Sequence, residues 1–344
     1  MSKNKTNLRR LMICSQLLVC AVLAIASARS SALMLNAGDI VTAGAGRFLH
    51  VNPLTGDITT ISSGSFFARE IAIEPGGTIL ATGSSRLIRI DPSDGSQADV
   101  ATLTLYGGLA LDSLSNIYVA GSTTAIPGIS IGDPGIFSID PVSGTISTVL
   151  LNPLLLAAEA MAFDSSGDLL IAIDTSSMLP NGAILRVDMD SLLVTVLVTP
   201  GDEHPYDIGS PHAIAVDPLD RIFYPHNGRP ALMRLDPGST EPTVVAIPSS
   251  CPPDVCMTYL GLALEASGMV LAAVGRHDTL TGGLARIDPA TGTVVFLGDP
   301  TEWHLFGNEL QAVAVVPTPD PSSTTLTGVS IVLVIALGCR FRKI

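Results

Sequence analysis

Two short patterns alternate along most of the chain, and this repetition constrains the fold more than any other feature of the sequence. The first is a strand-like run that ends in Asn or Asp and continues into Pro or a Gly turn, as at 138–144 and 286–292. Its Asn or Asp residues are Asn52, Asp91, Asp140, Asp188, Asp236 and Asp288. The second is an apolar run centred on Ala that leads into an acidic residue. Its copies lie at 71–74, 109–112, 161–164, 214–217 and 262–265, with a terminal copy at 313–315. The chain therefore repeats one unit six times.

A period of about 40 to 50 residues built from four short strands is typical of a β-propeller. The terminal copy at 313–315 has no strand after it, whereas strand-like segments at 39–42 and 48–51 begin the repetitive part without an apolar Ala run before them. We therefore predict an all-β, six-bladed β-propeller over residues 38–317. The C-terminal innermost strand pairs with the N-terminal strands in this prediction, which leaves no sheet edge open to aggregation.

The composition agrees with a fold of short strands and limits the classes of partner and of reaction that this protein can have. The chain has 32 Gly, 24 Pro and only 4% aromatic residues, which favours strands and turns over long helices. Acidic residues outnumber basic ones by 31 to 18, and the seven basic residues in the two ends leave a central body with no lysine. A nucleic-acid partner is excluded because a phosphate-binding surface needs positive charge. A lysine nucleophile is excluded as well.

The N-terminal 28 residues have the order of a secretory signal peptide. Basic residues come first, an apolar run follows at 11–26, and Ala26, Ser27 and Ala28 form a small-residue cleavage site. The run is short for a permanent membrane span. We expect residues 1–28 to be removed by signal peptidase after export through the inner membrane.

Residues 318–344 combine a Pro-rich linker, an apolar stretch at 326–337 and a basic tail of Arg340, Arg342 and Lys343. This tail resembles the PEP-CTERM sorting signal of exopolysaccharide-producing bacteria, although Asp320 stands where Glu is usual and Cys339 lies beside the basic cluster. The resemblance implies a short transmembrane helix, inserted at least transiently, an exosortase-like processing enzyme as a partner, and a location in the cell envelope or outside the cell. A plain C-terminal anchor is the alternative.

The repeats resemble those of the NHL, SMP-30 and streptogramin lyase group of six-bladed propellers. The segment Pro211-His212-Ala213-Ile214-Ala215-Val216-Asp217 is the closest piece and is similar to the start of a blade in streptogramin lyases. The resemblance implies the fold and not the reaction, since this architecture serves lyases, lactonases and binding proteins.

Successive strands of a blade alternate in direction, which places the long connections on one face of the propeller, here called the long-loop face. Binding loops on a rigid scaffold usually gather in this way. The histidines in or beside these loops are His204, His212, His226, His277 and His304. Imidazoles converging with carboxylates could hold a divalent metal or act as an acid and a base. We select His212 and His277 as the candidate catalytic pair and His226 as a ligand-binding residue. The alternative is that these histidines are merely solvated, and no metal or other cofactor is identified by spacing.

The mouth of the channel can be predicted from the residue two positions before each Ala-centred run. These positions hold Arg69, Gly107, Glu159, His212, Leu260 and Gln311. Their mixed polarity could orient a small polar ligand, so we predict Arg69, Glu159 and Gln311 as ligand-binding residues. The alternative is that Arg69 and Glu159 only pair with each other at a water-filled mouth.

Two further patterns have a structural interpretation. Cys251 and Cys256 are predicted to form a disulfide after export, with a redox or metal-binding pair as the alternative. The acidic turn at 164–168 resembles part of a calcium loop but lacks the terminal Glu, so a hairpin turn capped by Asp and Ser is favoured.

Three functions remain open from the sequence. The first is an exported, envelope-associated or extracellular binding module that contacts a glycan, peptide or matrix protein through the long-loop face. The second is a metal-assisted, lyase-like enzyme with a histidine-based site over the channel. The third is a structural component of an extracellular matrix, for which no site is needed.

Overall fold

The computed structural model describes residues 33–83, 85–122, 132–174, 176, 178–179, 182–198, 211–226, 231–246, 257–276, 283–298 and 310–318. The chain divides into the units Met1–Met34 and Leu35–Ile344, and every strand belongs to the second unit. The predicted signal peptide and C-terminal sorting helix lie outside the described residues. Within the described part of the chain, no helix has the length and apolar character needed to cross a membrane.

The second unit is an all-β propeller of six four-stranded antiparallel blades, which confirms the predicted fold. We number the blades in chain order and give their strands from the innermost outward. Blade 1 has β4 (Glu70–Ile73), β5 (Ile79–Gly83), β6 (Arg86–Ile90) and β7 (Gln97–Thr102). Blade 2 has β8 (Thr104–Leu111), β9 (Ile117–Ser122), β10 (Pro134–Ile139) and β11 (Ile146–Leu151). Blade 3 has β12 (Ala158–Phe163), β13 (Leu169–Ile173), β14 (Ala183–Val187) and β15 (Val194–Val198), and the 3-10 helix η1 (Pro153–Leu155) precedes it.

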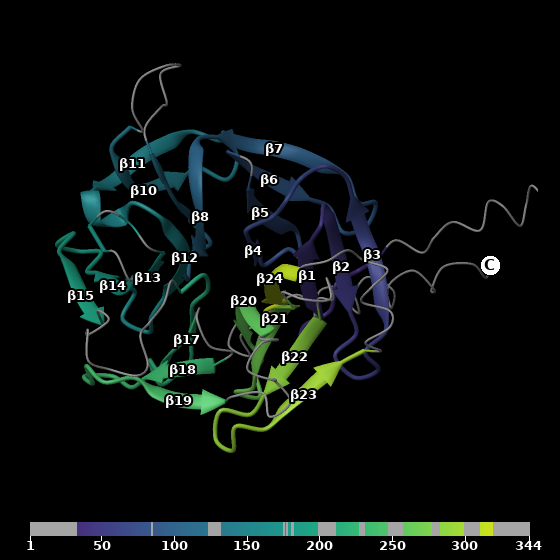
Figure 1. Ribbon diagram of the computed structural model, residues 1–344. Helices are drawn as coiled ribbons and strands as arrows, with labels where there is room; N and C mark the ends of the chain where they lie inside the picture. Colours follow the sequence, from purple (N-terminus) through teal and green to yellow (C-terminus); the bar gives the residue numbers. More distant parts are fainter. Residues whose placement is uncertain are drawn as a thin grey trace, which may run out of the picture. The chain divides into compact units, whose positions relative to one another are not determined.

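The remaining blades complete the ring. Blade 4 has β16 (Ala215–Val216), β17 (Ile222–His226), β18 (Ala231–Leu235) and β19 (Thr243–Ala246). Blade 5 has β20 (Met257–Leu264), β21 (Val270–Arg276), β22 (Gly283–Ile287) and β23 (Val294–Leu297). Blade 6 has β24 (Leu310–Val315), β1 (Ile40–Gly44), β2 (Arg47–Val51) and β3 (Ile58–Ser63). Figure 1 shows the blades around a common axis, with β4, β8, β12, β20 and β24 nearest the centre.

The ring closes in blade 6, where the two ends of the propeller share one sheet. Strand β24 pairs antiparallel with β1, and the register places Ile40 opposite Val315 and Thr42 opposite Val313. The buried Thr42 hydroxyl donates to the Ala312 carbonyl at 2.8 Å. The predicted closure is therefore confirmed, and strand pairing across it joins residues far apart in the chain.

The hydrophobic core lies between neighbouring blades. One cluster joins Ile136 of blade 2 with Ile171 and Leu185 of blade 3, and another joins Leu49 of blade 6 with Leu271 of blade 5. All five side chains are at most 1% exposed. Each buried aliphatic side chain of this size stabilises the fold by about 1.5–3 kcal/mol. Apolar residues that face each other across neighbouring blades thus hold the blades together.

The repeated Asn or Asp residues cap the tight turns. The side chains of Asn52, Asp140 and Asp188 accept the backbone N–H two residues further on, at 2.9–3.0 Å. These bonds form Asx turns, which offer the backbone a local substitute for the strand ladder. Hydrogen bonds from Ser143 and Ser191 lower the pKa of Asp140 and of Asp188 below its ordinary value.

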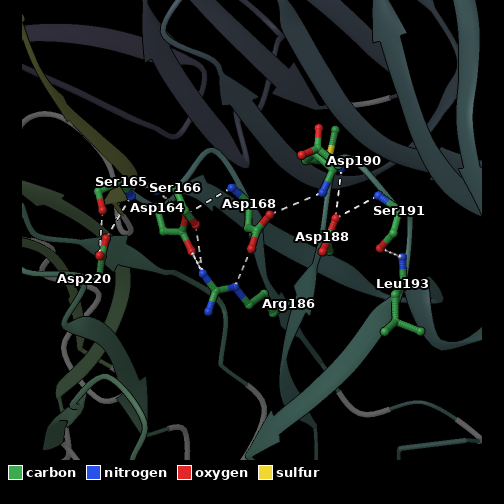
Figure 2. A network of polar contacts seen from close by, with 11 residues as sticks. Asp164, Ser165, Ser166, Asp168, Arg186, Asp188, Asp190, Ser191, Leu193 and Asp220 are labelled. Atoms are coloured by element: carbon green, nitrogen blue, oxygen red, sulfur yellow. Dashed lines mark hydrogen bonds and ion pairs between the residues drawn. The ribbon is translucent and has the colours of Figure 1, made fainter.

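The arginine two residues before the repeated Asp ties the turns of a blade together. In blade 3, Arg186 pairs with Asp164 and with Asp168, at 2.5 and 2.8 Å (Figure 2). Arg89 pairs in the same way with Glu74 in blade 1, and Arg286 pairs with Glu265 in blade 5. The two sequence patterns are therefore joined by one repeated ion pair.

The turn at 164–168 is a capped hairpin, as predicted. Asp164 accepts hydrogen bonds from the backbone N–H groups of Ser166 and Asp168, and Asp220 of blade 4 accepts from Ser165 (Figure 2). The carboxylate oxygens are thus engaged by N–H, hydroxyl and guanidinium donors rather than arranged around a metal ion.

Candidate functional site

A polar pocket of about 420 Å3 lies at one end of the propeller axis. It is lined by Arg69, Glu159, Asp174, His212, Leu260 and Gln311. Five of these six residues belong to the ring predicted from the repeat. They converge because the innermost strands all run in the same direction, so equivalent positions on them lie at the same height along the axis.

Arg69 and Glu159 form an ion pair across the mouth of the channel. The Nη1 atom of Arg69 donates to both carboxylate oxygens of Glu159 at 3.0 Å and to the Tyr106 carbonyl at 3.0 Å. The Arg69 side chain remains 53% exposed, whereas that of Glu159 is only 16% exposed. Arg69 directly precedes strand β4 of blade 1 and Glu159 is the second residue of strand β12 in blade 3, so the pair spans the innermost strand of blade 2.

Gly107 makes this span possible because it places no side chain between the two partners. A Cβ atom at Gly107 would lie 2.7 Å from the Glu159 carbonyl oxygen and 3.1 Å from its Oε2 atom. The Gly107 φ angle of 153° also falls in a region that side chains rarely adopt. The glycine in the ring is therefore required for the close approach of strands β8 and β12.

A second ring of residues lies one position further along the innermost strands, below the pocket. Five of its six members are small. The ring consists of Gly108, Ala160, Ala213, Gly261, Ala312 and Glu70. The Glu70 side chain accepts hydrogen bonds from the backbone N–H groups of Leu109 and Met161. Glu70 thus reaches from blade 1 to the inner strands of blades 2 and 3, and it lines the space of only about 40 Å3 beneath the pocket.

Burial controls the charge of both glutamates at the axis. Desolvation raises the pKa of Glu70 well above its ordinary value, outweighing the two backbone hydrogen bonds that lower it. Desolvation also raises the pKa of Glu159, and the nearby Arg69 only partly offsets this effect. Glu70 therefore holds its proton at a higher pH than a solvated glutamate, and the charge of Glu159 depends on Arg69.

His212 is the titratable residue of the pocket whose pKa favours the uncharged form. Burial lowers its pKa below the ordinary value, while Asp174 raises the pKa and Arg69 lowers it further. The same Asp174 also raises the pKa of Glu159. Arg69, Glu159, Asp174 and His212 consequently act on one another electrostatically, and they form one cluster with two carboxylates, one guanidinium and an uncharged imidazole.

The structure brings together some of the predicted site residues and not others. Arg69, Glu159, Gln311 and His212 share the pocket. His226 ends strand β17, is 5% exposed, and is not among the residues that line the pocket. His277, Cys251 and Cys256 lie outside the described residues, so the catalytic pair and the disulfide stay predictions.

Two residues of the site were missed by the sequence analysis. Asp174 follows directly after β13, on the loop side of the second strand of blade 3. Its signal is an acidic residue where a second strand meets the long-loop face. Glu70 is signalled by being the one charged residue at a position that is Gly or Ala in the other five repeats.

No metal centre is evident in the described part of the chain, where no group of three or more His, Cys, Asp or Glu side chains is arranged to hold a metal ion. The pocket as described offers hydrogen-bond donors and acceptors with charges of both signs. Such a set suits binding and orienting a polar molecule.

Comparisons with known proteins show the fold and nothing finer. No family model matches the chain, and no curated protein matches it. Solved structures do match. A chain in the crystal structure of a nidogen/laminin complex has 14% identity and a TM-score of 0.60, and the match covers 81% of this chain and 99% of that one. TolB from Acinetobacter baumannii has 14% identity and a TM-score of 0.59, with 86% and 70% covered. A protein of unknown function from Bacteroides caccae has 14% identity and a TM-score of 0.57, with 81% and 98% covered.

Proposed function

We propose that this protein is a binding module that takes a polar ligand into the axial pocket from the long-loop face. The observation that carries the proposal is the convergence of Arg69, Glu159, Asp174 and His212 on one pocket, although they come from three blades. Convergent polar groups on a rigid scaffold, in a pocket of about 300–1,000 Å3, are the usual features of a small-molecule site.

The size of the pocket limits what it accepts. A volume of about 420 Å3 suits a small molecule or a single residue of a polymer. An extracellular polysaccharide or a matrix protein could therefore present one sugar or one side chain to the pocket while the surrounding loops contact the rest. The match to a chain from a nidogen/laminin complex gives a propeller of the same fold that was solved together with a binding partner.

Binding is better supported than a metal-assisted lyase reaction. The lyase hypothesis needs His212 to act with His277, which lies outside the described residues, whereas the binding proposal uses groups that already share a pocket. His212 with its lowered pKa is uncharged near neutral pH and serves as a hydrogen-bonding group. Membership of the NHL, SMP-30 and streptogramin lyase group remains part of the proposal for the fold.

The proposal includes export and attachment to the cell envelope. Residues 1–28 would direct export, and residues 318–344 would act as the sorting signal or anchor. Both ends of the propeller leave from the face with the tight turns, because β24 ends there and β1 begins there: the Gly38 N–H donates to Val316 O, and the Val316 N–H donates to Asp39 O. A membrane anchor would therefore hold the tight-turn face towards the membrane, with the pocket facing away.

Pocket binding can be tested with one substitution placed on each face. Leu260→Trp fills the pocket, while Leu114→Trp adds the same side chain to a turn residue that is 81% exposed on the opposite face. Saturation-transfer NMR with a panel of monosaccharides, uronic acids and amino acids should detect binding to the wild type and to Leu114→Trp, and no binding to Leu260→Trp. Equal binding by the two variants would contradict the proposal.

Export can be tested separately by mass spectrometry of the protein from the cell envelope. Removal of residues 1–28 supports the signal peptide, and loss of the tail beyond 318 supports processing. An intact N-terminus on a cytoplasmic protein would contradict export without affecting the binding test.

A further inference from the structure

The guanidinium of Arg69 forms its hydrogen bonds with the described residues through one of its three nitrogen atoms. Its Nη1 atom makes every hydrogen bond that the Arg69 side chain forms with the described residues, to Glu159 and to the Tyr106 carbonyl. The Nε and Nη2 atoms form none with that part of the chain, and the side chain is 53% exposed. Parallel N–H donors on Nε and Nη2 form a fork that matches the two oxygens of a carboxylate. Glu159 and Tyr106 thus hold Arg69 with its second edge available.

The same pocket carries excess negative charge on its other walls. Among the described residues that line it, Glu159 and Asp174 are carboxylates, Arg69 is the one cation, and His212 is uncharged. Each oxygen of Glu159 accepts a hydrogen bond from the same Nη1 atom of Arg69, and a carboxylate oxygen has room for a second donor. An ammonium group supplies three such donors.

Ligands with one kind of charge fit this arrangement poorly. A simple anion on the Arg69 fork would lie close to Glu159 and Asp174, in a protein whose net charge is −13. A simple cation beside the carboxylates would leave the fork unused and would be repelled by Arg69. A molecule with both charges pairs each of them.

We propose that the pocket binds a small zwitterion, with its carboxylate on the Nε and Nη2 edge of Arg69 and its ammonium group against Asp174 and Glu159. This inference rests on the proposed function and names the ligand class for the same pocket. Gln311 and His212 complete the lining with uncharged hydrogen-bonding groups, and Leu260 contacts the aliphatic part of the ligand.

The test compares four molecules of similar size by isothermal titration calorimetry at pH 7.5 and low salt. These four probes are the zwitterion 4-aminobutyrate, the anion butyrate, the cation butylammonium and the neutral butyramide. Three further zwitterions, glycine, β-alanine and 6-aminohexanoate, vary the separation of the two charges. The best zwitterion is expected to bind at least about tenfold more tightly than butyrate and butylammonium, as one added charge-assisted contact would provide. Zwitterions that bind no more tightly than the singly charged probes would overturn the inference.

Two variants assign the two ends of the ligand. Arg69→Gln should reduce the affinity for the best zwitterion at least about tenfold and leave butylammonium binding unchanged or tighter. Asp174→Asn should weaken the zwitterion and leave butyrate unchanged or tighter. Val142→Ala, at a residue that is 94% exposed on the tight-turn face, is the control and should bind as the wild type does. The inference fails if Arg69→Gln and Asp174→Asn keep wild-type affinity for the zwitterion.

The failure of this inference can be told from the failure of the proposed function. If D-glucose or another neutral sugar binds and Leu260→Trp abolishes that binding, while no zwitterion binds, the pocket is a binding site for a different class of ligand. If the zwitterion binds and Leu260→Trp has no effect, the axial pocket is not the site and both proposals are wrong.

Discussion

Ion pairs between an arginine and a carboxylate occur on both faces of the propeller, but they join different parts of it. On the tight-turn face, Arg186 pairs with carboxylates of its own blade, and Arg89 and Arg286 repeat that arrangement in other blades. At the axial pocket, Arg69 pairs with a glutamate from a different blade, and its guanidinium is half exposed. The recurring pairs stabilise the repeated unit, whereas the Arg69–Glu159 pair joins two different blades and leaves the Nε and Nη2 donors of Arg69 unused by the described residues. Charged residues whose pairs recur from blade to blade are therefore assigned a structural role. Arg69, whose pair lies at the axis, is a candidate functional residue.

The largest effect on stability is expected from breaking a repeated pair. Arg186→Ala leaves Asp164 without its cation, and the Asp164 side chain is only 3% exposed. We expect a loss of about 2–3 kcal/mol in the free energy of unfolding, below the range for fully buried pairs because Arg186 itself is partly exposed. Urea denaturation measures the change.

Arg86→Ala is the control for that measurement. The Arg86–Asp99 pair is exposed on both sides, so its removal should cost less than about 1 kcal/mol. Equal losses for the two variants would show that the repeated pair has no special role in holding the blade.

A smaller but clear effect is expected at the glycine that brings blades 2 and 3 together. Gly107→Ala places a Cβ atom 2.7 Å from the Glu159 carbonyl oxygen, and we expect a loss of about 1–2 kcal/mol with displacement of the Arg69–Glu159 pair. Gly76→Ala is matched to it, because a Cβ atom there has no neighbour within 4 Å. Thermal unfolding of the two variants should differ clearly, and equal melting temperatures would contradict the requirement for glycine in the ring.

The raised pKa of Glu70 predicts that the free energy of unfolding depends on pH, with an effect of modest size. Because its pKa is raised in the folded state, the protonated carboxyl stabilises the fold below the ordinary value of 4.5, and this contribution is lost as the pH rises through the raised pKa. Glu70→Gln keeps an acceptor for the Leu109 N–H but cannot ionise. Relative to wild type, the variant should gain stability progressively as the pH rises from the ordinary value of 4.5 through the raised pKa of Glu70.

The measurement for Glu70 is the melting temperature of both proteins across that pH range. Glu159 is present in both proteins and its charge contributes to the raised pKa of Glu70, so the pH dependence of the difference includes the coupling between the two carboxyls. A difference that is constant with pH would mean that Glu70 does not titrate with a raised pKa.

The smallest effect on stability is expected at the pocket arginine. Arg69→Gln should change the free energy of unfolding by less than about 1 kcal/mol, since the side chain is half exposed and its pair is solvent-screened on one side. Urea denaturation beside Arg186→Ala provides the comparison. A loss as large as that of Arg186→Ala would place Arg69 among the structural arginines.

The sequence predicted those parts of the site that strand register controls. Hydrogen-bonded strands fix the height of each position along the axis, so counting back from the Ala-centred runs identified Arg69, Glu159 and Gln311 as pocket residues. Asp174 was missed because it follows a second strand rather than an innermost one. Glu70 was missed because its neighbours in the repeat are small, and the consequence of one large residue among them appears only in three dimensions.

Loop residues could not be placed in the same way. The long connections do not follow the repeat, so sequence spacing carries no information about where their side chains lie. His226 illustrates this limit: it was predicted as a ligand-binding residue from its place beside a long loop, and it ends strand β17, is 5% exposed and is not among the residues that line the axial pocket. His212 lies in the pocket because it occupies the ring position before its own innermost strand.

The most direct test of the difference between the two faces is an NMR spectrum of the arginine side chains. In a correlation of the Nε and Hε nuclei, recorded while 4-aminobutyrate is added, the signal of Arg69 should shift progressively and the signals of Arg89, Arg186 and Arg286 should stay in place. Signals are assigned from the spectra of Arg69→Gln and of single Lys substitutions at the other three arginines. Shifts of the tight-turn arginines with an unchanged Arg69 signal would contradict the account.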